Sequence, residues 1–301
     1  GTFDGLHRGH LNVLNEAKAF AFEGFVPAML MFNTHPQSVL KGYAPPLLIT
    51  MEDKEDFAKS NGVLPIHISF EEIKDLSPEE FLRDILINKY NVGAVICGEN
   101  FLFGKDGGGN SKILCELCEK YGIIYKMAQS IEYKGEMISA TRIRKALADG
   151  DIRTANEMLG RKFSYDFLVV EGNKIGKKIL GFPTINQHFP NGFINLKYGV
   201  YASQSTVDDK IYPSVTNFGC HPTIGGDKVL SETCILGFDG NLYYQKVRVE
   251  LLDFIRSEKK FSSKDELKAQ IDADSKSAIE IFNKFKNNFL QEQITTSNRF
   301  T

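Results

Sequence analysis

Four short apolar runs in the first half of the chain alternate with amphipathic stretches. Each run has the length of a buried strand, and the stretches between them repeat apolar residues at helical spacing. The run Ser77-Pro78-Glu79-Glu80 has the pattern of a capping box and marks one helix start. This alternation favours a parallel sheet covered by helices. The expected strands are 25–32, 63–70, 92–97 and 123–128, and the expected helices are 11–22, 50–59, 77–90, 111–121, 141–148 and 151–159.

After Gly160 the pattern changes to short β-rich runs separated by Gly, Pro and Asn. Such runs are typical of a small antiparallel barrel or sandwich. Helical patterning then returns: Ser263 with Glu266 resembles a capping box, and 278–290 repeats apolar residues at helical spacing. The last residues, 291–301, are polar and expected to fray. We therefore predict an α/β domain over 1–160 and a β domain with a terminal helix over 161–301. The expected strands of the second domain are 167–170, 200–207, 211–218, 233–238 and 246–252.

Composition narrows the class of protein. The 301 residues are 42% hydrophobic and 25% charged, with a net charge of −2, so a globular fold without a broad basic field is expected. No apolar run is long enough to span a membrane. Five cysteines, an odd number, argue against a disulfide scaffold and for a reducing compartment. Cys115 and Cys118 lie within an expected amphipathic helix, so we interpret them as core residues rather than as a redox or zinc pair.

The first ten residues, Gly-Thr-Phe-Asp-Gly-Leu-His-Arg-Gly-His, carry the strongest chemical signal. His7 and His10 are three residues apart where a loop becomes a helix, so their imidazoles face the same way. The start of a helix attracts phosphate, and Gly9 lets a nucleotide approach the backbone. A capping or surface role is the simpler alternative for a lone histidine. Because such a loop normally follows a strand, we also expect that a first strand precedes Gly1.

Two further segments of the first half can contribute to such a site. Residues 138–144, Ile-Ser-Ala-Thr-Arg-Ile-Arg, place hydroxyls, backbone N–H groups and arginines at a helix start, which suits a β- or γ-phosphate. An ordinary capped helix with exposed arginines is the alternative. Residues 98–109 combine aromatic side chains with a glycine run, which is consistent with a lid, a site for a flat ring system, or a plain flexible turn.

Taken in order, the motifs resemble one family. G-x-F-D-G-x-H-x-G-H, His35-Pro36, G-x-x-F-x-F-G and I-S-x-T-x-I-R are similar to the adenylyltransferase half of the bifunctional riboflavin kinase/FMN adenylyltransferases, the bacterial FAD synthetases. In the second half, G-F-P-T-I-N at 181–186 and N-F-G-C-H-P-T at 217–223 resemble the kinase motifs. The resemblance covers essentially the whole chain. It implies a Rossmann-like nucleotidyltransferase domain followed by a small antiparallel kinase barrel.

The resemblance implies a role for several residues of the kinase half. Thr184 and Asn186 would supply oxygen ligands to Mg²⁺, which ATP phosphates share. Glu232 would act as general base on the ribityl hydroxyl of riboflavin. The loop 172–181 would cover ATP, and Arg256 would contact the flavin. The implied ATP-binding residues of this half are Gly172, Gly176, Lys178, Gly181 and Pro183.

In the transferase half the resemblance implies direct attack of the FMN phosphate on the α-phosphorus of ATP. His7, His10 and Arg144 would stabilise charge on the phosphates, with Mg²⁺ assisting. The implied ATP contacts are Gly1, Phe3, Asp4, Gly9, Ser139 and Thr141, and the implied flavin contacts are Asn100, Phe101 and Phe103. The products of the two reactions would be FMN with ADP, and FAD with pyrophosphate.

The chain departs from the family pattern at several positions. Asn100 stands where Asp is expected, Leu102 where a basic residue is expected, and Ala140 where serine is usual. His221 takes the place of a common arginine, and Lys177 or Lys178 replaces another. Gly237 and Tyr244 replace residues expected as Asp and Gly, and the spacing from Gly176 to Gly181 is one residue longer. These changes bear on flavin affinity and on the ATP loop, while the core groups remain.

Three other functions deserve comparison. Another nucleotidyltransferase with an H-x-G-H motif, such as a cytidylyl- or pantetheine-phosphate adenylyltransferase, leaves the β-rich half unexplained. A class I aminoacyl-tRNA synthetase disagrees with the near-neutral charge and with the lack of a K-M-S-K-S-like segment. A flavin-binding or regulatory protein without turnover is the third. We expect a cytoplasmic enzyme, a monomer or weak homo-oligomer, that acts on small molecules and binds neither nucleic acid nor membranes.

Overall fold

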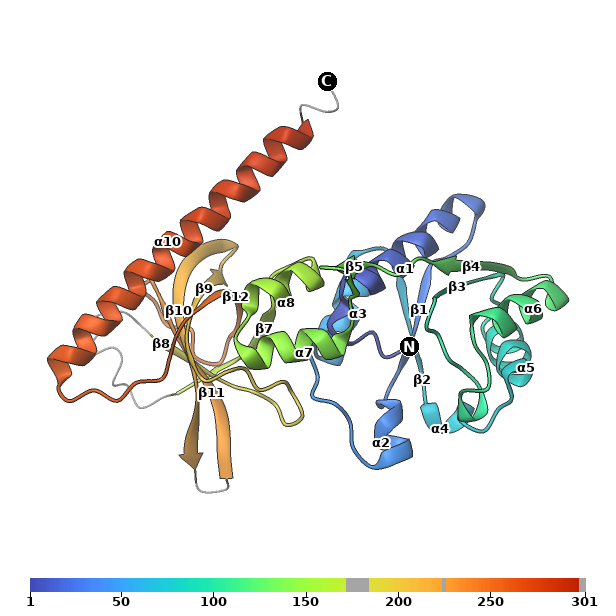
Figure 1. The fold of residues 1–301 in the computed structure, drawn as a ribbon, viewed down its shortest axis with the longest axis horizontal. Helices are drawn as coiled ribbons and strands as arrows, with labels where there is room; N and C mark the ends of the chain where they lie inside the picture. Colours follow the sequence, from blue (N-terminus) through green and yellow to red (C-terminus); the bar gives the residue numbers. More distant parts are fainter. Residues whose placement is uncertain (172–183, 224–225, 298–301) are drawn as a thin grey trace. The chain divides into compact units, whose positions relative to one another are not determined.

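The computed structural model describes residues 1–171, 184–223 and 226–297, with the backbone alone at 220–223, 226–228 and 288–297 (Figure 1). Its contacts divide the chain into two compact units, Gly1–Arg142 and Ile143–Thr301, each of which is described by itself. Helix α8 (Ile152–Leu159) belongs to the second unit by these contacts. The expected boundary near Gly160 stays a prediction.

The first unit is built from parallel strands joined through helices, as the alternation in the sequence predicts. One parallel pair, β1 with β2, is connected through α3, and the second pair, β3 with β4, is connected through α6. Helix α1 packs against β3 and β4. The bounds are β1 Ala28–Phe32, α3 Met51–Ser60, β2 Leu64–Ile68, β3 Ala94–Gly98, α6 Ser111–Tyr121, β4 Ile124–Ala128 and α1 Arg8–Ala19.

Local capping sets several of these helix ends. The side chain of Asn110 accepts hydrogen bonds from the backbone N–H groups of Lys112 and Ile113, and α6 ends at Gly122, which has a φ of 67°. Ser77 and Glu80 form the predicted capping box. The remaining elements of this unit are η1 Asp4–Leu6, η2 Phe20–Glu23, α2 Pro36–Lys41, α4 Phe70–Ile73, α5 Pro78–Glu80, η3 Phe81–Lys89, η4 Lys105–Gly107, β5 Glu132–Tyr133 and β6 Glu136–Met137.

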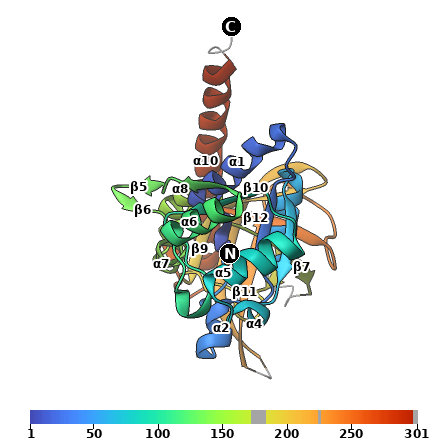
Figure 2. The same cartoon turned by 90° about the vertical axis from the view of Figure 1, so that its right-hand side faces the viewer.

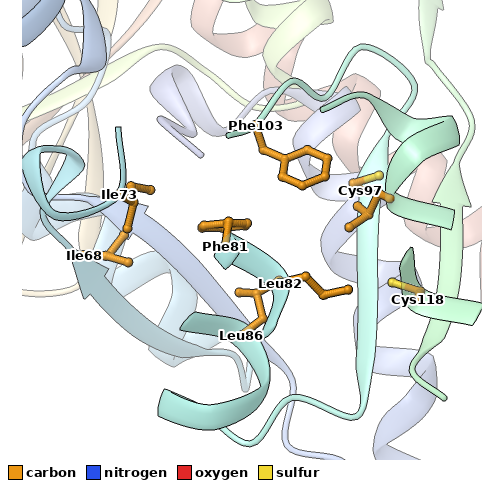
Figure 3. Close-up of a cluster of buried hydrophobic side chains, with 9 residues drawn as sticks. Ile68, Ile73, Phe81, Leu82, Leu86, Cys97, Phe103 and Cys118 are labelled. Atoms are coloured by element: carbon orange, nitrogen blue, oxygen red, sulfur yellow. The ribbon is translucent and has the colours of Figure 1, made fainter. Parts of the chain in front are cut away.

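One hydrophobic cluster of the first unit lies between η3, β3 and α6 (Figure 3). Phe81 and Leu82 of the π-helix η3 meet Leu114 of α6 there, all at most 5% exposed. Burial of each such side chain contributes about 1.5–3 kcal/mol to folding. The complete set is Ile68, Ile73, Phe81, Leu82, Leu86, Cys97, Phe103, Leu114 and Cys118.

The two cysteines of the C-x-x-C sequence have different surroundings. Cys118 lies in this cluster near Cys97, and burial raises the pKa of its thiol to about 11. Cys115 is exposed. The predicted core role is therefore confirmed for Cys118 and is wrong for Cys115, because an i, i+3 pair spans the edge of the narrow apolar face.

The second unit contains a closed antiparallel barrel of six strands in the order β10-β11-β8-β7-β12-β9. Helix α10 (Lys264–Ser297) lies along β9, β10 and β12 (Figures 1 and 2). These features, with the parallel strands of the first unit, confirm the predicted fold class. The strands are β7 Ser164–Val170, β8 Thr184–His188, β9 Gly199–Val207, β10 Lys210–Thr223, β11 Gly226–Ile235 and β12 Lys246–Ser257, and α7 (Ala140–Asp149) precedes α8.

Two expectations for this unit were wrong. The sequence predicted no strand at 184–188, where Pro and Asn favour turns, but β8 forms because β7 and β11 pair with it on both sides. The terminal helix continues to Ser297 rather than fraying from Gln291, while its start at Lys264 agrees with the predicted cap, because Ser263 Oγ accepts a hydrogen bond from the N–H of Glu266. Packing of Ile281, Phe282 and Phe285 near the barrel anchors the middle of this long helix, from which helical hydrogen bonding propagates.

Candidate functional site

The loop before α1 has an unusual backbone. Phe3 and Leu6 adopt φ angles of 46° and 41°, and Gly5 adopts 74°, so three of four consecutive residues are left-handed. The conformation costs side-chain-bearing residues about 1–3 kcal/mol each and persists only where surrounding structure imposes it. Leu6 is fully buried in a cluster with Leu14 and other core residues, which fixes one end of the loop.

His7 and His10 meet at the start of α1. His7 precedes the first helical residue with extended backbone angles, and it is 7% exposed. The two imidazole rings are stacked, with centroids 3.7 Å apart and planes 18° apart, and Phe3 packs edge-on against His10 at 5.3 Å. Two hydrogen-bonding rings therefore lie together at the positive end of a helix, an arrangement suited to phosphate.

Two glycines lie close to the rings of this site, where a larger residue would crowd them. A Cβ at Gly9 would lie 3.1 Å from Cε1 and 3.2 Å from Nδ1 of His7, and a Cβ at Gly1 would lie 3.1 Å from the Phe3 ring. Any side chain at Gly9 would therefore press on the imidazole. The predicted grouping of His7, His10, Gly9 and Phe3 is present in the structure, and their contacts with ATP stay predictions.

Asp4 is buried below the loop rather than directed toward solvent, with 2% exposure. Its Oδ1 accepts a hydrogen bond of 3.0 Å from the backbone N–H of Leu48. Lys54 of α3, which belongs to none of the sequence motifs, is also buried and donates from Nζ to the carbonyl of Thr2 at 3.0 Å. The residues around Lys54 do not predict its burial, because a lysine among acidic residues on a helix normally faces water.

In the segment 138–144, Ser139 and Arg142 bond the protein's own backbone, whereas the sequence predicts groups directed at phosphate. Ser139 Oγ accepts a hydrogen bond from the N–H of Arg142, as in a helix cap. The Arg142 guanidinium donates to the carbonyls of Tyr133, Glu136 and Met137, and so holds the β5–β6 hairpin. Thr141 is exposed. Arg144 belongs to the second unit, so its approach to the histidines stays a prediction.

The aromatic segment after β3 is anchored in the core. The Phe103 ring points into the cluster with Phe81 and Cys97 (Figure 3), and Phe101 stacks on it at 5.4 Å. The glycine at 109 is required, because a Cβ there would lie 2.5 Å from the Phe103 ring. Asn100 is exposed and Phe101 is half-buried, so these two side chains remain accessible for the flavin contact that the sequence predicts.

In the barrel, three polar residues stand opposite one another on neighbouring strands. Asn186 of β8 pairs with Glu232 of β11, and Glu232 pairs with Asn217 of β10. Directly opposite residues point to the same face of a sheet. Thr184, two residues before Asn186, shares that face. The strand register therefore brings the predicted metal ligands and the predicted base together.

The residues next to Glu232 show whether it lies on the inner or the outer face of the barrel. Ser231 and Thr233 flank Glu232, and both are fully buried. Ser231 bonds Tyr165 from β7 at 2.7 Å, and Thr233 bonds Thr216 of β10 at 2.9 Å. Because β7 and β11 are not neighbours in the barrel, the bond between Tyr165 and Ser231 crosses its interior. Glu232 therefore points outward, where a substrate can approach.

The oxygen donors on this outer face suit a hard cation. Asn186 Oδ1 is buried and accepts no hydrogen bond from the residues that the structure describes. A buried amide oxygen without a partner is costly, and Mg²⁺ prefers such oxygen ligands. Within the described residues no group of three or more His, Cys, Asp or Glu side chains could hold a metal. Thr184 and Asn186 offer oxygen atoms of the kind that Mg²⁺ prefers, and their role as its ligands stays a prediction.

Arg256, predicted to contact flavin, is held by α10. Its Nε and Nη2 donate to the carboxylate of Asp274 at 3.1 and 2.8 Å, and Gln270 donates to the same carboxylate. Asp274 is only 3% exposed. This paired interaction joins β12 to the terminal helix. The structure therefore assigns Arg256 a structural contact that the sequence did not predict, and its flavin contact stays a prediction.

Several predicted positions lie outside the described residues. These are Gly172, Gly176, Lys178, Gly181 and Pro183, together with Lys177 and the side chain of His221. Among the helices that are described, none combines the length and the apolar character needed to cross a membrane.

Comparisons with known proteins agree with this two-part arrangement. Residues 1–142 match the FAD synthetase family, and residues 159–282 match the riboflavin kinase family. The chain is 36% identical over 295 residues to the bifunctional riboflavin kinase/FMN adenylyltransferase of Buchnera aphidicola subsp. Schizaphis graminum (strain Sg), covering 95% of this chain and 93% of that protein. For the protein of the same name from Bacillus subtilis (strain 168), identity is 34% and the coverage is 95% and 92%.

A solved structure extends the likeness to the fold. The crystal structure titled macrolide-efflux protein from Streptococcus pneumoniae superposes with a TM-score of 0.82 at 27% identity, and the alignment covers 92% of this chain and 91% of that one. The similarity therefore includes both the parallel unit and the barrel.

Proposed function

The chain belongs to the bifunctional riboflavin kinase/FMN adenylyltransferase family, and on this basis we propose where each of its two reactions takes place. The protein phosphorylates riboflavin with ATP and adenylylates FMN to FAD. Adenylyl transfer is assigned to the His7–His10 pair and phosphoryl transfer to the barrel face with Glu232. The alignment of Glu232 with Asn186 across two strands is the observation that carries the kinase assignment.

Adenylyl transfer needs no protein nucleophile. A phosphate oxygen of FMN attacks the α-phosphorus of ATP, the bond from that phosphorus to the bridging oxygen breaks, and pyrophosphate leaves. His7 and His10 hydrogen-bond the phosphate oxygens on which negative charge accumulates, and the N-terminus of α1 adds its positive field. The close stacking of the two rings supports a joint action on neighbouring oxygens.

Phosphoryl transfer needs a base and a charged phosphate site. Glu232 accepts the proton of the terminal ribityl hydroxyl as that oxygen attacks the γ-phosphorus of ATP and ADP leaves. Thr184 and Asn186 would hold Mg²⁺, which neutralises phosphate charge when bound. The half-buried position of Glu232 on an outer barrel face supports its access to substrate.

The remaining roles follow from the family and the geometry. Asn100 and Phe101 are proposed to form the FMN side of the transferase site, with Phe103 stacked behind Phe101 in the core. Arg256 is proposed to form the flavin side of the kinase site. Ser139, Thr141 and Arg144 are proposed to bind ATP phosphates. The enzyme is proposed to work in the cytoplasm on free riboflavin, FMN and ATP, as a monomer or weak homo-oligomer without nucleic acid or membrane partners.

A time course with the full chain tests the proposal. Riboflavin, ATP and Mg²⁺ are incubated with the protein, and flavins and nucleotides are separated by chromatography. We expect FMN and ADP first, then FAD and pyrophosphate, with FAD formed directly when FMN is supplied. A folded chain that binds flavin but yields neither product would instead be a binding protein without turnover.

A further inference from the structure

The first unit buries a lysine that neither reaction uses. Lys54 lies on α3 with 5% of its surface exposed, beneath the loop that carries the histidines. Its Nζ donates to the carbonyl oxygen of Thr2 at 3.0 Å. An ammonium group is among the most costly groups to bury, so its position needs compensating partners.

Asp4 is a second buried charged group of this region. Burial lowers the pKa of Lys54, and the charge of Asp4 acts in the opposite direction by stabilising the ammonium. Asp4 Oδ1 in turn accepts the backbone N–H of Leu48. Lys54 and Asp4 therefore join three separate segments: the loop 1–6, the residues around Leu48, and helix α3.

The loop needs such a constraint because its backbone is strained. Phe3, on the chain between Thr2 and Asp4, is left-handed, and Leu6 is left-handed directly before His7. Packing of Leu6 in the core fixes the second position. Phe3 packs partly buried against the same cluster, and hydrogen bonds hold the residues on either side of it: the carbonyl of Thr2 accepts from Lys54, and Asp4 accepts from the N–H of Leu48. The direction in which Phe3 and His7 leave the loop depends on both anchors.

We propose that Lys54 is a positioning residue for adenylyl transfer. Its ammonium fixes the carbonyl of Thr2, next to the left-handed Phe3, and thereby sets the loop that leads to the stacked rings of His7 and His10. This inference rests on the assignment of adenylyl transfer to the histidine pair. Lys54 itself touches neither ring, and it acts through the loop backbone.

The test uses neutral variants of the full chain. Lys54→Met and Lys54→Gln remove the charge, and Gln retains a donor for Thr2. Lys59→Met is the matched control, because Lys59 lies on the same helix with 58% of its side chain exposed. The kcat and KM of FAD formation from FMN are measured at a temperature where circular dichroism shows a folded protein. Riboflavin kinase activity of the same sample is the internal reference.

We expect kcat for FAD formation to fall about 100-fold in the neutral variants, which is the order of effect that a misplacement of 1 Å produces. KM for ATP should change much less, the kinase rate should stay constant, and Lys59→Met should match the unchanged protein. The histidine ring signals in NMR spectra should also shift, since the stacked rings shield each other. A folded neutral variant with unchanged kcat would overturn the proposal.

Two further variants keep the outcome clear. If both neutral variants unfold the first unit, Lys54→Arg is measured. A folded protein with reduced kcat supports positioning, whereas unchanged kcat with a bulkier donor of different geometry shows that the placement of this group does not set the loop, and overturns the proposal. His10→Ala tests the premise separately. If His10→Ala still makes FAD at the full rate, the site assignment is wrong, whatever the Lys54 variants show.

Discussion

The imidazole rings of His7 and His10 stack with their centroids 3.7 Å apart at the first turn of α1. Neither ring reaches this position by helical spacing alone. His7 is in extended conformation just outside the helix, and a left-handed Leu6 precedes it. The position of the two rings therefore depends on the strained loop as well as on the helix. Small changes in the loop should lower the rate of FAD formation without lowering the stability of the fold.

Gly9→Ala separates these two effects. Alanine in place of a helical glycine ordinarily stabilises a helix by about 1 kcal/mol. Here its Cβ would press on His7 at 3.1 Å. We expect an unchanged or raised melting temperature together with a loss of FAD formation of about 10- to 100-fold. Asn15→Ala, an exposed position on α1, is the control that should keep full activity.

Glu232→Gln tests the kinase base. The change preserves shape and removes the proton acceptor, so riboflavin phosphorylation should fall by about 10²- to 10⁴-fold. FAD formation from supplied FMN should continue at the unchanged rate. Glu280→Gln, on the exposed side of α10, should leave both activities intact. Equal loss of both activities in Glu232→Gln would contradict the division of the two reactions.

Asn186 offers a test of the cation site. Because its Oδ1 has no protein donor among the described residues, Asn186→Leu removes no hydrogen bond at that atom and should not lower the melting temperature. The Mg²⁺ concentration needed for half-maximal kinase rate should rise by about 10-fold or more, since an oxygen ligand is lost. Asn186→Asp, which keeps an oxygen donor, is the matched comparison. An unchanged Mg²⁺ requirement in Asn186→Leu would place the cation elsewhere.

Arg256 and Asp274 should stabilise the contact between β12 and α10. Arg256→Met leaves a buried carboxylate without its cation, and we expect the free energy of unfolding of the second unit to fall by about 3 kcal/mol. Urea unfolding followed by circular dichroism measures this. Asp274→Asn breaks the same pair while leaving the arginine in place. If only Arg256→Met weakens riboflavin binding, the arginine also contacts flavin.

Local features of the structure could be predicted from the sequence because they depend on neighbouring residues. The capping box at Ser77 and Glu80, and the helix between Asn110 and Gly122, involve hydrogen bonds over at most four residues. The alternation of strands and helices likewise follows from periodicity along the chain. The motif residues could be selected because each has a chemical type suited to phosphate, cation or proton.

The placement of those residues required the tertiary structure. Arg142 and Arg256 have the side chains of phosphate or flavin ligands, yet they bond a hairpin and a helix that pack against them. The ring of Phe103, predicted to contact flavin, lies in the hydrophobic core. Strand β8 depends on two partners distant in sequence.

For the first ten residues, the sequence by itself determined that two histidines stand at a helix start beside glycine. Only the tertiary structure decided that Lys54 and Asp4 are buried beneath them and that the loop is left-handed. The physical reason is that the burial of a charge and the strain of a backbone depend on which distant segments pack over them, and periodicity along the chain carries no information about that packing.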